Sequence, residues 1–249
     1  MKISKMNILE NKRIVLTSKV ILLLALLYFP LFLHLERLPM KIWDEARYAV
    51  SACEMNLNGN YLVVYFDGSP ENWNTKPPML IWIQTLMIKI MGVRELAFRL
   101  PSALAALFTA LLMAYFSKKY LNSFWFGFIS AILLVTSYGY VHHHGTRTGD
   151  YDSLLTFLMA AYSFSFFIFL ESGKVKFVHL FFSMLTLAVL TKSVQAVLFL
   201  PGLGILALTY KERIAELFKS KWLYIDFLLF ISCSSRLLSF KRTLQSRLP

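Results

Sequence analysis

Residues 79–91 read MLIWIQTLMIKIM, and the placement of this apolar stretch decides the fold. Thirteen helical residues are only about 20 Å long, whereas the hydrocarbon core of a bilayer is about 30 Å thick. The polar residues Gln84, Thr85 and Lys89 also interrupt the run. We therefore predict that the stretch forms an interfacial or re-entrant helix and does not span the membrane.

The charges on either side of this stretch favour the same threading, because lysine and arginine prefer the cytoplasmic side of membrane proteins. If residues 79–91 do not span, the basic residues after the later apolar runs join the basic N-terminal flank inside, and most acidic residues lie outside. A spanning helix would instead place Lys118 and Lys119 outside. The sequence thus predicts a cytoplasmic N-terminus, with residues 36–97 and 142–152 meeting on the external side.

The composition is typical of a membrane protein. The chain of 249 residues is 57% hydrophobic and 16% charged, with a mean hydropathy of +0.57, and a soluble domain of this length does not need so apolar a composition. We predict an all-α membrane protein, a multi-pass transmembrane helix bundle of about 6–7 spans with interfacial amphipathic helices in the first external loop, residues 36–97. The expected spans are residues 14–35, 96–116, 123–141, 153–170, 177–191 and 194–210, with a further apolar run at 222–231.

The net charge of +12 would suggest nucleic acid as the partner of a soluble protein. Here the basic residues are interpreted as topology signals, so we expect membrane lipids and no nucleic acid as partners. The two cysteines, Cys53 and Cys233, form neither a disulfide framework nor a metal-binding spacing.

The C-terminal end differs from the rest of the chain. The apolar run that begins at residue 222 gives way to serines and Arg236, and the basic residues after it would lie outside if the run spanned. We therefore divide the chain into a transmembrane core, residues 1–231, and an irregular basic tail, residues 232–249. We interpret the sequence as a truncated or frame-shifted product.

Residues 44–57, in the first external loop, give an amphipathic pattern on a helical wheel. The polar face consists of Asp44, Arg47, Ser51 and Glu54. The apolar face consists of Ala46, Ala49, Val50, Cys53 and Leu57. We predict a surface helix that lies apolar side down on the membrane or over a cavity and holds a carboxylate beside a guanidinium. A solvated helix face with an incidental salt bridge is the simpler alternative.

A second polar segment, Gly145-Thr-Arg-Thr-Gly-Asp-Tyr-Asp152, lies at the external entrance of the fourth expected span. An unpartnered carboxylate so close to the membrane is costly, so we expect a partner for Asp152, although helix capping is an equal alternative. Asp150 and Arg147 in the same loop favour a functional role. The preceding His142, His143 and His144 point in different directions on a helix, which favours a polar interfacial cap over a metal site.

Three cations are expected to reach the same external pocket: Arg47, Lys76 and Lys192. Snorkelling is the alternative for Lys192. Cations in a partly dry cavity call for an anion, and phosphate is the commonest anion that lipid-facing enzymes meet. Together with the carboxylates of Asp44, Asp150 and Asp152, they suit transfer of a group from a phosphate carrier to a hydroxyl. The cations would stabilise the departing phosphate, and a carboxylate would take the hydroxyl proton.

Five short motifs occur in a specific order. They are Trp43-Asp-Glu-Ala-Arg-Tyr48, Thr75-Lys-Pro-Pro78, Arg99-Leu-Pro-Ser-Ala103, Arg147-Thr-Gly-Asp-Tyr-Asp152 and Leu190-Thr-Lys192. In this combination the chain resembles, over about residues 15–212, the multi-pass GT-C glycosyltransferases related to the aminoarabinose transferase of lipid A and the dolichyl-phosphate-mannose–protein mannosyltransferases.

The resemblance implies a glycosyltransferase of the inner (plasma) membrane. Its donor would be a polyprenyl-phosphate-linked sugar, transferred with inversion on the external, periplasmic face to lipid A, another glycan or a protein. Asp44 corresponds to the family's catalytic carboxylate, and Asp152, with Asp150 beside it, to the acidic residue at the next external helix start. Arg47, Lys76 and Lys192 are expected near the lipid phosphate, and we assign Glu45 and Arg147, from the same motifs, to substrate binding.

Three departures accompany the resemblance. Thr75 stands where the aminoarabinose enzymes carry an acidic residue, so the sequence supports no metal ligand there and no cofactor. Ser193 replaces a glycine, and family members continue through further spans. The alternative functions are a non-catalytic truncated fragment of such an enzyme, or a membrane transporter or flippase whose charges line a path. The concentration of charges at one face disfavours the transporter.

Overall fold

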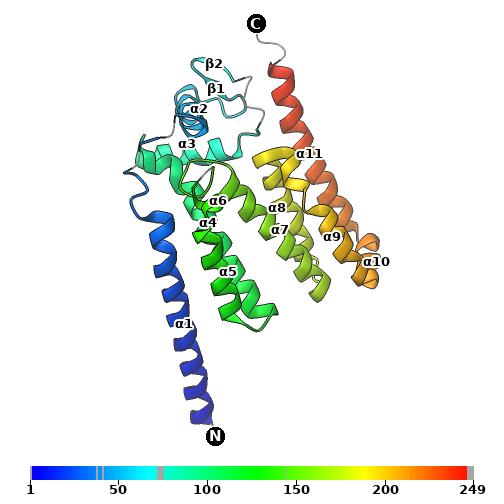
Figure 1. Cartoon of the computed structure of the whole chain (residues 1–249). Coiled ribbons are helices and arrows are strands. Elements are labelled where there is room, and N and C mark those ends of the chain that lie inside the picture. Colours follow the sequence, from blue (N-terminus) through cyan, green and yellow to red (C-terminus); the bar gives the residue numbers. More distant parts are fainter. Residues whose placement is uncertain (1, 38, 41, 72–75, 143, 246–249) are drawn as a thin grey trace.

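The computed structural model describes residues 2–37, 39–40, 42–71, 76–142 and 144–245, with only the helical backbone for residues 2–13 and 236–245. The regular secondary structure of this part of the chain is helical except for one small hairpin (Figure 1). The helices are α1 (Lys2–Phe32), α2 (Asp44–Asn58), α3 (Met79–Met91), α4 (Glu95–Tyr120), α5 (Phe124–Thr136), α6 (Tyr138–Val141), α7 (Asp152–Ser172), α8 (Lys176–Lys192), η1 (Ser193–Val197), α9 (Leu200–Ala207), η2 (Leu208–Tyr210), α10 (Lys211–Lys219) and α11 (Lys221–Gln245).

Long helices run alongside one another and form the bundle (Figure 1). Within the described ranges, four segments are long and apolar enough to cross a membrane: Ile14–Phe32, Glu95–Tyr120, Asp152–Ser172 and Lys176–Val197. The prediction of a multi-pass helical membrane protein is therefore confirmed.

Two of the expected spans are interrupted. Residues 123–141 form the 13-residue helix α5, which ends before Ser137, and the single turn α6. Residues 194–210, expected as one span, form the short helices η1, α9 and η2 instead. The first break is at Ser193, whose φ of +41° leaves the helical region. Pro201 stands in the first turn of α9, where a proline begins a helix without loss of a helical hydrogen bond.

Helix α3 has the bounds expected for the non-spanning stretch and lies across the ends of the long helices (Figure 1). Its polar residues Gln84 and Thr85 are buried. The side-chain amide of Gln84 donates hydrogen bonds to the carbonyls of Phe98 (3.0 Å) and Gly149 (3.1 Å). These polar residues therefore join α3 to α4 and to the loop before α7.

The turn at Asp67-Gly68 connects the strands β1 (Tyr65–Phe66) and β2 (Ser69–Pro70). Both central residues have positive φ, +55° for Asp67 and +71° for Gly68, as in the type I′ turns that Asp-Gly favours. The amide of Gly68 donates to the Glu54 carboxylate (3.1 Å), which fastens the hairpin to α2.

Helix α2 is amphipathic, but the buried face differs from the predicted one. The buried residues are Glu45, Tyr48, Ala49, Ser51, Ala52 and Met55. Of the predicted apolar face, Ala49 is buried, whereas Val50 is 39% and Leu57 81% exposed. Two buried residues explain the difference. Glu45, through its ion pair with Arg99 described below, and Tyr48 both point into the bundle, and together they fix which face of the helix is buried.

The irregular tail expected from residue 232 is also corrected over the described range. Helix α11 continues to Gln245. Residues 221–245 contain neither glycine nor proline, so nothing in the local sequence stops the helix.

Candidate active site

A buried ion pair fixes the start of α2. The Glu45 carboxylate accepts two hydrogen bonds from the guanidinium of Arg99 in α4, at 2.5 and 3.1 Å. The two residues are only 3% and 2% exposed. Arg99 also donates to the carbonyls of Leu35 (2.8 Å) and Pro39 (3.0 Å), and Glu45 accepts from the Gly149 amide (3.2 Å). We name this pair the buried clasp.

The buried clasp corrects one expectation. Glu45 was assigned to substrate binding, but its carboxylate is engaged inside the protein. Arg99, the first residue of the third motif, joins α4 to α2 and to the segment after α1. Both residues position the site without lining it.

The loop between α6 and α7 is held against the bundle by close backbone contacts. A Cβ at Gly145 would lie 2.1 Å from the carbonyl oxygen of Tyr140, and one at Gly149 would lie 3.0 Å from that of Phe98. Arg147 donates to the carbonyls of Pro30 (3.1 Å) and Leu33 (2.6 Å). Burial, followed by the nearby charge of Arg99, lowers the pKa of Arg147. Arg147 therefore ties the loop to α1, which corrects its assignment to substrate binding.

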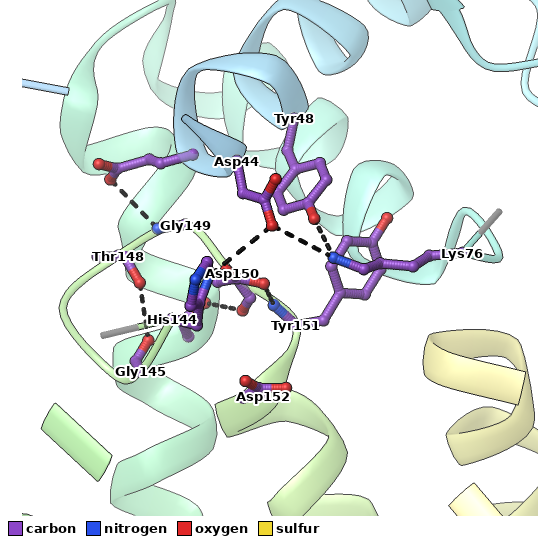
Figure 2. A network of polar contacts seen from close by, with 12 residues as sticks. Asp44, Tyr48, Lys76, His144, Gly145, Thr148, Gly149, Asp150, Tyr151 and Asp152 are labelled. Atoms are coloured by element: carbon purple, nitrogen blue, oxygen red, sulfur yellow. Dashed lines mark hydrogen bonds and ion pairs between the residues drawn. The ribbon is translucent and has the colours of Figure 1, made fainter. Parts of the chain in front are cut away.

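The same loop brings Asp150 next to Asp44 through His144 (Figure 2). Nδ1 of His144 lies 2.5 Å from Oδ2 of Asp150 and 3.8 Å from Oδ2 of Asp44. Asp150 is 2% exposed and accepts a further hydrogen bond from the Tyr151 amide (2.6 Å). The segments 36–97 and 142–152 therefore meet, as predicted from the charges.

The sequence predicted His144 only as part of a polar interfacial cap, whereas the structure places its ring between the carboxylates of Asp150 and Asp44. Its φ of +51° lies in the left-handed region, where asparagine, aspartate and histidine are enriched. No periodic pattern reports such a conformation, and only the neighbouring Gly145 hints at a tight turn. The ring of His142 instead packs against Tyr138, with centroids 4.8 Å apart, and His143 lies outside the described residues.

The cluster of Asp44, His144 and Asp150 has the ligand types that hold a divalent cation, within 4.8 Å of one another. However, Nδ1 of His144 already bonds Asp150, and the Lys76 ammonium lies 3.6 Å from Asp44. The arrangement is thus an ion-pair network with both signs of charge, and we assign no metal to it. Thr75, the position of the departure from the family pattern, lies outside the described residues.

Lys76 is held by two tyrosines. Its ammonium donates to the Tyr48 hydroxyl and lies 4.8 Å from the ring centroid of Tyr48 and 5.3 Å from that of Tyr151. The two rings pack edge to face, 5.0 Å apart. Burial, followed by the carboxylates of Asp150 and Asp44, raises the pKa of Tyr48. The phenol therefore stays neutral and orients Lys76.

Lys192, at the end of α8, pairs with Asp152, the first residue of α7. Asp152 does not cap the helix, because the cap position belongs to Tyr151 and no side-chain cap bond is made. Beside this pair lies a cavity of about 270 Å³, which we name the lysine cavity. It is lined by Lys76, Lys192, Ser193, Val194 and Gln195.

Arg47 lies apart from the two lysines, contrary to the expectation of one shared pocket. Its guanidinium donates two hydrogen bonds, of 2.8 and 2.7 Å, to Glu71 and lies 4.5 Å from the ring centroid of Phe66. The hydrogen bond to Glu71 raises the pKa of Arg47. A second cavity of about 370 Å³, which we name the Trp43 cavity, is lined by Ile42, Trp43, Asp44, Ala46, Arg47, Val50 and Phe66.

The predicted site residues therefore separate into three groups. The first forms a set of ion pairs beside the lysine cavity and consists of Asp44, Asp150, Lys76, Lys192 and Asp152. Glu45 and Arg147 hold the scaffold, and Arg47 lines the Trp43 cavity, which Asp44 also lines. The sequence did not predict the contacts of Arg99, His144 and Glu71. These contacts join positions far apart in the chain or lie in irregular loops, where no periodic pattern indicates them.

Comparison with known proteins gives a consistent picture. The sequence profile described as dolichyl-phosphate-mannose-protein mannosyltransferase matches residues 75–240. YycA of Bacillus subtilis (strain 168), a candidate mannosyltransferase by name, is 29% identical over 143 residues, 57% of this chain and 20% of YycA. An uncharacterized protein of Aquifex aeolicus (strain VF5) is 33% identical over 102 residues, 40% of this chain and 20% of that protein.

Among solved structures, ArnT from Cupriavidus metallidurans bound to undecaprenyl phosphate has a similar fold. The TM-score is 0.72 and the identity 18%, over 94% of this chain and 43% of ArnT. This likeness concerns the fold. The chain spans about a fifth of the length of the curated relatives and less than half of ArnT.

Proposed function

Since the chain belongs to the dolichyl-phosphate-mannose-protein mannosyltransferase family of glycosyltransferases, we propose that it transfers a sugar from a polyprenyl-phosphate carrier to an acceptor. The transfer would proceed with inversion on the external face of the inner membrane. The observation that carries this proposal is the lysine cavity next to Asp44, where Lys76 and Lys192 face the same space.

The lysine cavity suits the phosphate of the carrier. Two ammonium groups provide charge-assisted hydrogen bonds to phosphate oxygens. Both ammonium groups pair here with carboxylates, Lys76 with Asp44 and Lys192 with Asp152. A phosphate that enters the cavity would replace these carboxylates as the partner of the two lysines. Asp44 would then be available to accept the proton of the acceptor hydroxyl. The binding of undecaprenyl phosphate by ArnT is consistent with such a ligand.

Asp44 is the group we assign to proton transfer. In the reaction, the acceptor oxygen bonds to the anomeric carbon, the bond from that carbon to the phosphate oxygen breaks, and the electron pair stays on the phosphate. The proton of the acceptor hydroxyl passes to the Asp44 carboxylate, which is 31% exposed at its side chain and so can reach a ligand. The lysines stabilise the charge that develops on the departing phosphate.

The test is a transfer assay on the 249-residue chain in nanodiscs, with native lipid extract as the source of donor. Asp44→Asn should lower transfer by about two orders of magnitude or more, the range of general base catalysis, while polyprenyl-phosphate binding stays within a few-fold. The matched control is Asp67→Asn, because Asp67 lies in the hairpin turn and asparagine tolerates its positive φ. Equal loss of binding and transfer in Asp44→Asn would contradict a catalytic role and favour the transporter alternative.

A further inference from the structure

The pair of His144 and Asp150 has no part in the transfer proposed above, although it lies beside Asp44 (Figure 2). Nδ1 of His144 is 2.5 Å from Oδ2 of Asp150 and 3.8 Å from Oδ2 of Asp44. Ionised carboxylates only accept hydrogen bonds, so the nitrogen between them carries a hydrogen. The ring therefore donates to Asp150, and a small movement of Asp44 would bring the second carboxylate to the same N–H group.

Asp150 is a fixed support for this ring. Its side chain is only 3% exposed, and its Oδ1 accepts a hydrogen bond from the Tyr151 amide (2.6 Å). Its carbonyl accepts another from the Ser102 hydroxyl of α4 (2.8 Å). A buried carboxylate of this kind fixes the tautomer and the orientation of the imidazole that it holds. The His144 side chain is half exposed, so the ring is held on one side and open on the other.

The backbone at His144 adopts a conformation that residues other than glycine seldom adopt, with a φ of +51°. The following residues maintain it. A Cβ at Gly145 would lie 2.1 Å from the carbonyl oxygen of Tyr140, and the Thr146 amide donates to that same carbonyl (3.0 Å). Unfavourable conformations that the surrounding structure maintains gather at active sites. The placement of this ring beside Asp44 is therefore a built feature of the loop.

Two basic groups approach Asp44, and the proposed function removes one of them. The Lys76 ammonium lies 3.6 Å from Oδ2 of Asp44, and Nδ1 of His144 lies 3.8 Å from the same oxygen. A carrier phosphate that engages Lys76 would take this partner from Asp44 when the carboxylate has to accept a proton. Misplacement of a catalytic group by about 1 Å can lower a rate by about 100-fold. The reaction thus requires another group that holds the carboxylate in place.

We propose that His144 is the positioning residue for Asp44. When the carrier phosphate binds Lys76, the Asp44 carboxylate moves toward His144, and Nδ1–H is then shared by the carboxylates of Asp44 and Asp150. Hydrogen bonds at catalytic groups are often long in the free enzyme and shorten in the substrate complex, as this change requires. The inference rests on the proposed function, because the carrier phosphate drives the exchange of partners.

The first test is NMR of nitrogen-labelled histidine rings of the chain in nanodiscs, before and after addition of undecaprenyl phosphate. It does not depend on turnover. The His144 signals are identified by their loss in His144→Asn. The expected result is a change in the Nδ1 resonance of His144 that disappears in Asp44→Asn and has no counterpart at His34. His34 is the matched control, because it is also exposed and also has a positive φ, +55°.

The second test is the rate of transfer at saturating lipid extract. His144→Ala should lower this rate by about 10- to 100-fold while carrier binding is unchanged. His144→Asn should recover most of the loss, because asparagine keeps an N–H donor and tolerates a positive φ. His34→Ala should leave the rate unchanged. In an Asp44→Asn background His144→Ala should cause no further loss, since residues that act as a unit are not additive.

Two results would overturn the inference and leave the proposed function intact. One is carrier binding without a change at His144, and the other is Asp44-dependent transfer that His144→Ala does not slow. Equal loss of transfer and of carrier binding in both His144 variants would also overturn it, because the histidine would then only support the loop. The expected NMR change without any transfer would contradict the proposed function alone, and a chain that binds no carrier would contradict both.

Discussion

Asp44 and Glu45 are neighbours in the sequence, and their carboxylates occupy opposite environments. Glu45 is in the buried clasp with Arg99, with both residues almost fully excluded from solvent. Asp44 is about one-third exposed and meets Lys76 at 3.6 Å, with His144 nearby (Figure 2). Successive residues of a helix point about 100° apart, so Glu45 points into the bundle, whereas Asp44 lines the Trp43 cavity and pairs with Lys76 of the lysine cavity.

Ion pairs between carboxylates and basic side chains therefore serve two purposes in this protein, one structural and one in the candidate site. In the buried clasp every contact is internal, so removing one partner leaves an uncompensated buried charge. In the pairs around the lysine cavity, we propose that an incoming anion takes the place of a carboxylate. The neighbours Glu45 and Asp44 thus combine a scaffold residue with a candidate catalytic residue.

The largest expected effect concerns the buried clasp. Glu45→Gln leaves the Arg99 guanidinium buried without its counter-charge, and we expect a loss of about 3–5 kcal/mol in the free energy of unfolding. Thermal or denaturant unfolding in detergent measures this loss. Asp44→Asn is the matched control, with an expected change under about 1 kcal/mol. Equal losses in the two variants would remove the distinction between the neighbours.

Arg47 and Glu71 form a pair of intermediate burial, with side chains 30% and 2% exposed. Glu71→Gln keeps the shape but removes the carboxylate charge, so we expect a loss of about 1–3 kcal/mol in unfolding free energy. Carrier-phosphate binding should stay unchanged, because Arg47 lies outside the lysine cavity. If Glu71→Gln instead lowered carrier affinity as much as a substitution of Lys76 or Lys192, the result would support the single shared pocket that was predicted from the sequence.

The smallest expected effect has the opposite sign. Asp152 competes with an incoming phosphate for Lys192, and its side chain is 45% exposed. Asp152→Asn should therefore strengthen binding of undecaprenyl phosphate by about two- to fivefold. This change corresponds to the free energy that an exposed ion pair contributes. Equilibrium binding in nanodiscs measures the affinity. Weaker binding would mean that Asp152 positions Lys192 and does not compete for it.

Much of the fold follows from the sequence because length and charge constrain membrane helices strongly. Residues 79–91 are too few to span the bilayer. Once this stretch is placed outside the hydrocarbon core, the distribution of lysines predicts that the loops 36–97 and 142–152 lie on the same side of the membrane. The sequence also predicted that Asp44, Lys76, Asp152 and Lys192 share one pocket, and the structure pairs Asp44 with Lys76 and Asp152 with Lys192, the last residue of α8.

What the sequence did not predict depends on tertiary contacts. A helical wheel placed Val50 and Leu57 inside, because it counts apolar residues and cannot include a buried ion pair such as Glu45–Arg99. Arg47 was expected to lie near the lipid phosphate, but its guanidinium donates hydrogen bonds to Glu71, which lies in an irregular segment. The break at Ser193 was also missed, since an unusual φ leaves no periodic signal.

The most direct test of the account is the binding of undecaprenyl phosphate to the chain in nanodiscs. The variant is Lys76→Ala/Lys192→Ala, and the matched control is Lys118→Ala/Lys119→Ala in the last turn of α4. Since each charge-assisted bond contributes about 1.5–3 kcal/mol, the first pair should weaken binding by about 100-fold or more, and the control by less than about twofold. Similar affinities for the two double variants would contradict the placement of the carrier phosphate in the lysine cavity.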